Sequence, residues 1–106
     1  MIEALEPTEL RRRLDAGEEL VLLDVREEDE WELCRIEGSV WIPMGELSVR
    51  HVELDPDRPL VVVCHHGVRS AHAAIALEHL GFDCLYNLSG GVERWSREVD
   101  PGMPRY

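Results

Sequence analysis

The sequence contains no lysine, so its eleven Lys-or-Arg positions are all arginine and are set against 22 acidic residues. The formal net charge of −11 excludes the basic surface on which nucleic-acid binding depends, and we expect no nucleic acid partner. An acidic surface also provides no long-range attraction for small anions. An anionic ligand must therefore be held by local groups.

Long hydrophobic runs are also absent, and cysteine is scarce. No stretch approaches the roughly 18 apolar residues of a membrane span, and the acidic start lacks the basic and apolar regions of a signal peptide. The three cysteines, Cys34, Cys64 and Cys84, are odd in number and widely spaced, which argues against a disulfide framework and indicates a reducing compartment. We expect a soluble, cytoplasmic protein without a membrane partner.

No repeat, low-complexity segment or flexible linker divides the chain, so we expect one domain over residues 1–106. Apolar patterning predicts helices at 8–14, 27–33, 68–80 and after the turn at 89–91, and strands at 20–25, 40–42, 60–63 and 84–87. This alternation predicts an α/β fold with a parallel sheet covered by helices on both faces. Ligands bind such sheets outside the carboxyl ends of the strands.

The seven residues from Cys64 to Ser70, reading CHHGVRS, are the most informative stretch. An apolar β-branched run comes before them, Gly67 provides a flexible turn, and the predicted helix follows. Backbone N–H groups and a helix dipole therefore converge on Cys64 and favour its thiolate. Arg69 and Ser70 add a guanidinium and a hydroxyl, so we predict a reactive cysteine in an anion-binding loop rather than a buried, inert thiol.

Three stretches carry a family resemblance: LLDVREEDEWELCRIEGSVWIP (22–43), VVVCHHGVRSAHAAIALEHLGF (61–82) and LYNLSGGVERW (85–95). In this order they resemble a single rhodanese domain, of the sulfurtransferase family. The resemblance implies a three-layer α/β fold with a central, mostly parallel sheet and no metal or organic cofactor. It also implies that Cys64 is a nucleophile that carries sulfur as a persulfide. The residues cradling that persulfide with backbone N–H groups would be His65, His66, Gly67, Val68 and Arg69.

Loop length bears on the type of reaction. Four residues separate Cys64 from Arg69, whereas the related cell-cycle phosphatases have one residue more and a wider loop that fits phosphate. We expect Cys64 to take sulfur from a small anionic donor such as thiosulfate and pass it to cyanide, a thiol or a sulfur-accepting protein. Two alternatives stay open: a persulfide carrier or sensor that serves a protein partner without turnover, and a phosphatase or arsenate reductase.

Several side chains of these motifs have more than one possible role. Arg69 either binds the anion or ties the loop to a carboxylate elsewhere. Ser70 is expected to serve chiefly as a hydrogen-bonding residue in the first helical turn rather than directly in the chemistry. His65 and His66 either line the mouth of the site or are plain exposed loop residues. They make no metal site, because zinc needs several converging ligands.

The remaining motif residues are expected to be structural. Asp24 and Arg26 are expected to form a hydrogen-bonded scaffold near the site. Cys34 stands with Arg35 where the family usually has Gly-His, which raises the question whether Cys34 could resolve a Cys64 persulfide as a disulfide. Cys84 is expected in the core. The tail VDPGMPRY (99–106) is similar to the endings of rhodanese domains attached to adenylating enzymes that activate sulfur-carrier proteins.

Overall fold

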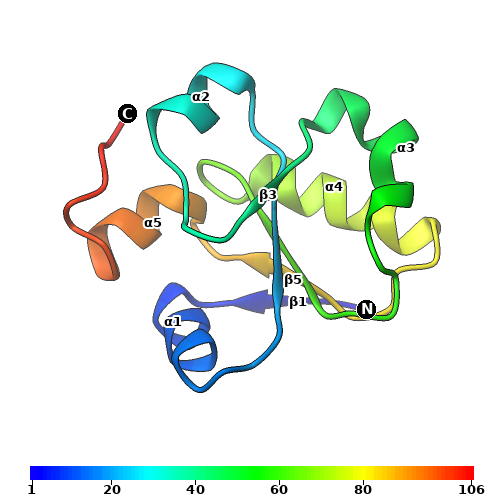
Figure 1. Cartoon of the computed structure of the whole chain (residues 1–106), viewed down its shortest axis with the longest axis horizontal. Coiled ribbons are helices and arrows are strands. Elements are labelled where there is room, and N and C mark those ends of the chain that lie inside the picture. The colour runs from blue at the N-terminus through cyan, green and yellow to red at the C-terminus, as the bar shows by residue number, and fades with distance from the viewer.

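Five parallel strands form one central sheet. The computed structural model describes all 106 residues (Figure 1). Its strands lie side by side in the order β1 (Ile2–Leu5), β5 (Leu85–Leu88), β4 (Leu60–Val63), β2 (Val21–Asp24) and β3 (Val40–Trp41). β4 is the middle strand, and all four of its residues are buried. This explains its uninterrupted apolar sequence, because a parallel strand covered on both faces has no solvent side.

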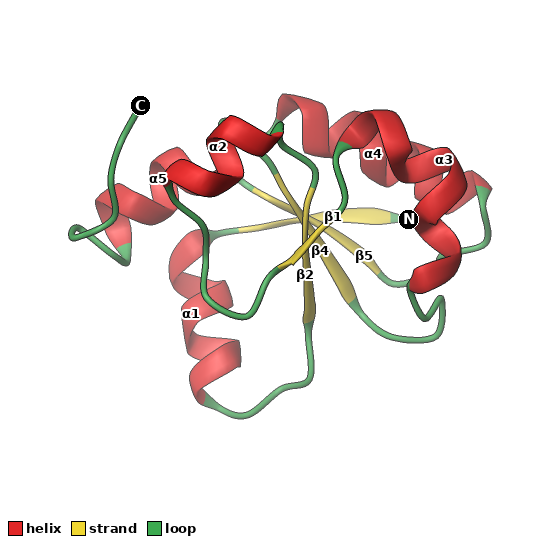
Figure 2. Ribbon diagram, turned by 45° about the horizontal axis from the view of Figure 1, so that its top comes forward, coloured by secondary structure: helices red, strands yellow, loops and turns green.

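Helices cover both faces of this sheet and produce three layers (Figure 2). α3 (Leu47–Arg50) and α4 (Val68–His79) pack on one face, and α1 (Pro7–Asp15) and α5 (Gly91–Glu98) pack on the other. α2 (Glu28–Leu33) lies between β2 and β3 in the chain. None of these helices is long and apolar enough to cross a membrane.

The pleat of β4 divides the core into two clusters. Leu60 and Val62 pack among the residues under α4, whereas Val61 and Val63 pack among those under α1 and α5. This alternation follows from the two-residue period of a strand. The α/β architecture predicted from the alternating pattern is confirmed, and Cys64 follows β4 at the carboxyl edge of the sheet.

Some local predictions were wrong. Cys84 is exposed and lies in the bend before β5, not in the core. The helix predicted over 68–80 ends one residue earlier, at His79, and its C-cap Leu80 is 45% exposed. Two further elements, β1 and α3, were not predicted from the sequence, and each is only four residues long. Short elements with few buried side chains leave little periodicity to detect.

Candidate active site

The first residues of α5 contact the backbone of Cys64 and hold it in place. Its side chain is buried and the whole residue is only 1% exposed. Its carbonyl oxygen accepts a hydrogen bond of 2.9 Å from the Val92 N–H. The backbones approach so closely that a Cβ on Gly91, which has φ +58°, would lie 2.2 Å from that same oxygen. Only glycine allows this contact between the two segments.

The residues after Cys64 curl around its sulfur. Gly67 adopts φ +104° and donates its N–H to Cys64 Sγ over 3.0 Å. Ser70, in the first turn of α4, places Oγ 3.2 Å from the same sulfur. The backbone N–H groups of His65, His66, Val68 and Arg69 donate to no other group of the chain. The loop therefore has spare donors beside a sulfur atom, as an anion-binding cradle requires.

Asn87 on β5, a residue that was not predicted from the sequence, completes this arrangement. Its Oδ1 accepts a 2.5 Å hydrogen bond from Ser70 Oγ, and its Nδ2 donates to the Gly67 carbonyl over 3.0 Å. The available signal was an amide inside the otherwise apolar strand LYNL. A partly buried amide needs hydrogen-bond partners, and here both partners belong to the neighbouring loop.

Arg69 forms a bidentate ion pair with Glu30 of α2. Arg69 Nη1 and Nη2 lie 2.7 and 2.8 Å from the two carboxylate oxygens. The Arg69 hydrogen bonds lower the pKa of Glu30 to about 2, against the opposing effect of burial, and the Glu27 N–H adds to this. The structure thus shows the ion pair with a carboxylate, which was one of the two roles expected for Arg69. The Arg69 side chain is still 37% exposed, and anion binding by it stays a prediction.

The expected scaffold role of Asp24 and Arg26 is confirmed. The two side chains form an ion pair of 2.7 Å and are 1% and 0% exposed. Arg26 also donates to the carbonyl of Cys34 over 2.6 Å. Nε and Nη2 of the guanidinium donate to the Asp24 carboxylate, and Nη1 donates to the Tyr106 hydroxyl, so each nitrogen of this buried charge has an acceptor. The pair joins the carboxyl end of β2 to the segment after α2.

Tyr106 connects the tail to the loop, a role that no local sequence signal indicated. Its hydroxyl accepts from Arg26 Nη1 and donates to Glu30 Oε2, each over 2.8 Å. Burial raises the pKa of this hydroxyl, which therefore keeps the proton it donates. Its ring stacks on His65, with centroids 3.8 Å apart and planes inclined by 12°. The tail therefore braces the residue next to Cys64.

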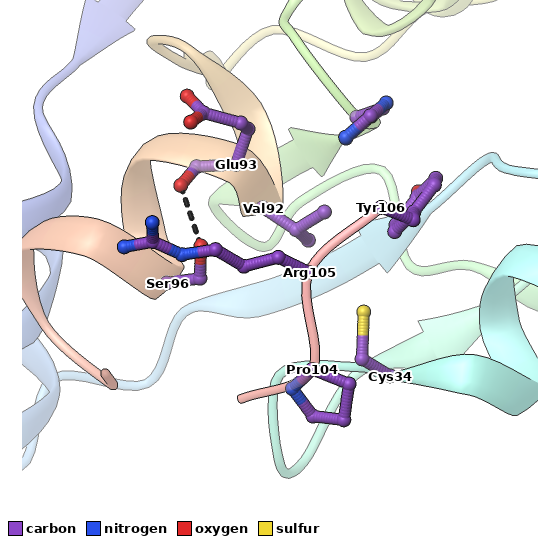
Figure 3. A pocket seen from close by; sticks show the side chains of 8 residues that line it. Cys34, Val92, Glu93, Ser96, Pro104, Arg105 and Tyr106 are labelled. Carbon is purple, nitrogen blue, oxygen red and sulfur yellow. Dashed lines mark hydrogen bonds between the residues drawn. The ribbon is translucent and has the colours of Figure 1, made fainter. Parts of the chain in front are cut away.

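The two histidines differ in their surroundings. His65 is half-buried between Tyr106 and His66, whose ring centroid lies 3.9 Å away, and His66 itself is exposed. Burial, followed by the charge of His66, lowers the pKa of His65. His65 also lines a small cavity beneath the tail (Figure 3), together with Cys34, Val92, Glu93, Ser96, Pro104, Arg105 and Tyr106.

The three cysteines are free thiols in different settings. Cys64 packs in the cluster under α4, whereas Cys34 belongs to the cluster on the opposite face and lies 3.8 Å from Arg26 Nη1. The two sulfurs thus face different partners. A resolving role for Cys34 gains no support from this placement.

Comparison with known proteins supports a common family. The family model "Rhodanese-like domain" matches residues 6–98. The chain is 38% identical over 104 residues to "Probable adenylyltransferase/sulfurtransferase MoeZ" of Mycobacterium tuberculosis, covering 96% of this chain and 26% of that protein. It is 34% identical over 94 residues to "Thiosulfate sulfurtransferase GlpE" of Coxiella burnetii, covering 89% of this chain and 84% of GlpE.

Similarity extends to three dimensions. The crystal structure of a rhodanese-related protein from Thermoplasma volcanium superposes with a TM-score of 0.82 at 32% identity, covering 92% of this chain and 93% of that one. The chain spans about a quarter of the length of MoeZ and most of the length of GlpE. The resemblance noted in the three sequence motifs is thus confirmed by the family model, whose match spans all three motifs, and by the superposition. The chain belongs to the rhodanese-like domain family.

Proposed function

We propose that this protein is a sulfurtransferase that moves sulfane sulfur from a donor such as thiosulfate to a thiophilic acceptor through a persulfide on Cys64. One observation carries the proposal: Cys64 Sγ lies inside a loop that already directs the Gly67 N–H at it over 3.0 Å and holds further unpaired N–H groups. The name of GlpE, a thiosulfate sulfurtransferase, supports this donor.

The reaction would proceed in two half-reactions. The Cys64 thiolate attacks the outer sulfur of thiosulfate, the S–S bond of the donor breaks, and sulfite leaves with the electron pair. The acceptor nucleophile then attacks the terminal sulfur of the persulfide, and the Cys64 thiolate is regenerated. Thiolate and persulfide are both anionic, and the N–H groups from His65 to Arg69 stabilise each of them. Neither step needs a metal or an organic cofactor.

The tightness of the loop favours sulfur over phosphate chemistry. The Gly67 N–H lies within hydrogen-bond distance of the cysteine sulfur itself, and Arg69 is paired with Glu30. A phosphatase would need its donors and its arginine directed at several phosphate oxygens beyond the sulfur. The short loop and the paired guanidinium fit a single added sulfur atom better.

Mass spectrometry after thiosulfate treatment tests the proposal. We expect one added sulfur on the peptide that contains Cys64, and we expect cyanide to remove it as thiocyanate. Cys84→Ser is the matched control, because Cys84 is an exposed thiol outside the loop, and this variant should keep both the adduct and the turnover. Absence of the adduct, or undiminished thiocyanate production by Cys64→Ser, would overturn the proposal. Aryl phosphate turnover lost in Cys64→Ser would instead identify a phosphatase.

A second candidate is a persulfide carrier that exchanges sulfur only with a protein partner. Two observations favour it: the net charge of −11 repels small anions, and Cys64 is only 1% exposed. A partner that docks over the loop would deliver or remove the sulfur directly and would not depend on free anions. Slow turnover with cyanide, combined with fast transfer to a sulfur-accepting protein, would identify the carrier.

A further inference from the structure

Ser70 stands between Cys64 and Asn87 and has only one proton to share between them. Its Oγ lies 3.2 Å from Cys64 Sγ and 2.5 Å from Asn87 Oδ1. Ser70 is fully buried, so water is no alternative partner for the hydroxyl. The direction of these two hydrogen bonds therefore decides what Ser70 offers to the sulfur.

The direction follows from the Gly67 carbonyl, which can only accept. The Asn87 atom that lies 3.0 Å from it must be the amide nitrogen. The other end of the amide is then an oxygen without a proton, and Ser70 must donate its single hydroxyl proton to it. What Ser70 turns toward Cys64 is a lone pair. The only proton available for the contact between Ser70 and Cys64 is that of the thiol.

We propose that Asn87 is a positioning residue that turns the Ser70 hydroxyl away from Cys64 and thereby stabilises the protonated, unloaded thiol. When Cys64 loses its proton, the Ser70 lone pair faces a negative sulfur. Ser70 can then donate to the sulfur only by leaving Asn87 Oδ1 without a donor, and an unsatisfied, partly buried acceptor is costly. Asn87 therefore competes with the sulfur for one proton.

The same competition for the Ser70 proton links the loading of Cys64 with sulfur to the hydrogen bonds that hold the loop. A persulfide, like a thiolate, has no proton on Sγ, so loading of Cys64 favours the turn of the Ser70 proton toward sulfur. Asn87 would then lose its bond to Ser70 while still holding Gly67, whose own N–H contacts the sulfur. This inference rests on the proposed function only in taking Cys64 as the reacting sulfur.

Other charges near the sulfur are unaffected by a change at Asn87. The charged and titratable groups on the surrounding elements are Arg69 on α4, Glu30 on α2, His65 and His66 in the loop, Glu93 on α5, Tyr106 in the tail, and the Asp24–Arg26 pair at the end of β2. β5 contributes the neutral Asn87. A variant at Asn87 thus alters hydrogen bonding to the sulfur without removing a charge.

The pH profile of Cys64 alkylation by iodoacetamide tests the proposal. We expect Asn87→Ala to free the Ser70 proton for the thiolate and to lower the midpoint of the profile by about one pH unit. Ser70→Ala should leave the midpoint unchanged or slightly lower. In the double variant the effect of Asn87→Ala should vanish. Peptide mass spectrometry resolves the three cysteines, and the exposed Cys84 provides an internal reference in every sample.

The double variant separates the proposed role from simple loosening of the loop. Asn87→Ala and the double variant both lose the contact between Asn87 and Gly67. If the midpoint of the pH profile also falls in the double variant, which lacks the Ser70 hydroxyl, the proposal is overturned. An unchanged or raised midpoint in Asn87→Ala would also overturn it. If that variant fails to fold, Ser70→Ala decides alone, because a raised midpoint would mean that Ser70 donates to the wild-type thiolate. Alkylation needs no sulfur transfer, so failure of the proposed function would leave this result readable.

Discussion

Arg69 and Glu30 form a bidentate ion pair, with nitrogen–oxygen distances of 2.7 and 2.8 Å, that joins the loop after β4 to α2. The same carboxylate accepts the Tyr106 hydroxyl, and Tyr106 stacks on His65. Glu30 therefore acts on both ends of the loop: directly at Arg69 and through Tyr106 at His65. The shape of the cradle around Cys64 depends on side chains that lie outside it.

We expect Arg69 and Glu30 to be energetically coupled. Arg69→Ala and Glu30→Ala should each lower the free energy of unfolding by about 1 kcal/mol, since solvent screens this part-exposed pair. The double variant should lose less than the sum, and urea denaturation of all four proteins gives the coupling. The exposed pair of Arg50 and Glu46 is the matched control, where we expect weaker coupling. Additive losses at Arg69 and Glu30 would contradict the prediction.

The ion pair should weaken in acid. The pKa of Glu30 is about 2 in the folded protein, below its ordinary value of 4.5, so the folded state binds this proton more weakly than the unfolded state. Its stabilising contribution is complete above about pH 4.5 and is lost as the pH falls toward 2. The stability difference between wild type and Glu30→Gln should shrink over that interval in denaturation experiments. A difference that stays constant with pH would show that the carboxylate charge is irrelevant.

Two variants of Tyr106 should separate the contribution of its ring from that of its hydroxyl. Tyr106→Phe keeps the stack on His65 but leaves Arg26 and Glu30 without the hydroxyl, which should cost about 1 kcal/mol of stability. Tyr106→Ala also uncovers His65, whose pKa burial lowers, so that pKa should rise toward its ordinary value. NMR titration of the His65 ring measures this. Equal His65 titration in wild type and Tyr106→Ala would refute the bracing role.

Gly91→Ala should disrupt the site by displacing the backbone of Cys64 and His65. Its Cβ would lie 2.2 Å from the Cys64 carbonyl oxygen and 2.4 Å from that of His65, and backbone atoms cannot rotate away. We expect a loss of about 2 to 4 kcal/mol together with reduced sulfur loading of Cys64. Gly17→Ala is the control: Gly17 has φ +82° but nothing within 4 Å, so it adds backbone strain alone. Similar losses in both variants would mean that strain, and not the close contact, explains Gly91.

The sequence by itself determined the α/β layering and the position of Cys64. The apolar run of β4, the glycine turn and the start of α4 are consecutive in the chain, so local patterning is enough to place a cysteine at a strand end before a helix. The loop length is likewise a property of the sequence. Burial could be predicted where periodicity was strong. The predicted burial of Cys84 was wrong, because Cys84 lies in the bend just before β5 and not within the strand.

Only the tertiary structure decided which side chains act on that loop. Asn87 on β5 binds Ser70, which is 17 positions away, and Glu30 on α2 binds Arg69, which is 39 positions away. Tyr106 in the tail binds Glu30, which is 76 positions away, and stacks on His65 of the loop. Local patterns carry no information on such pairs, because they depend on how parallel strands and their connections come together at one edge of the sheet. The direction of the Ser70 hydrogen bond is the clearest case, since it follows from one carbonyl oxygen facing one amide.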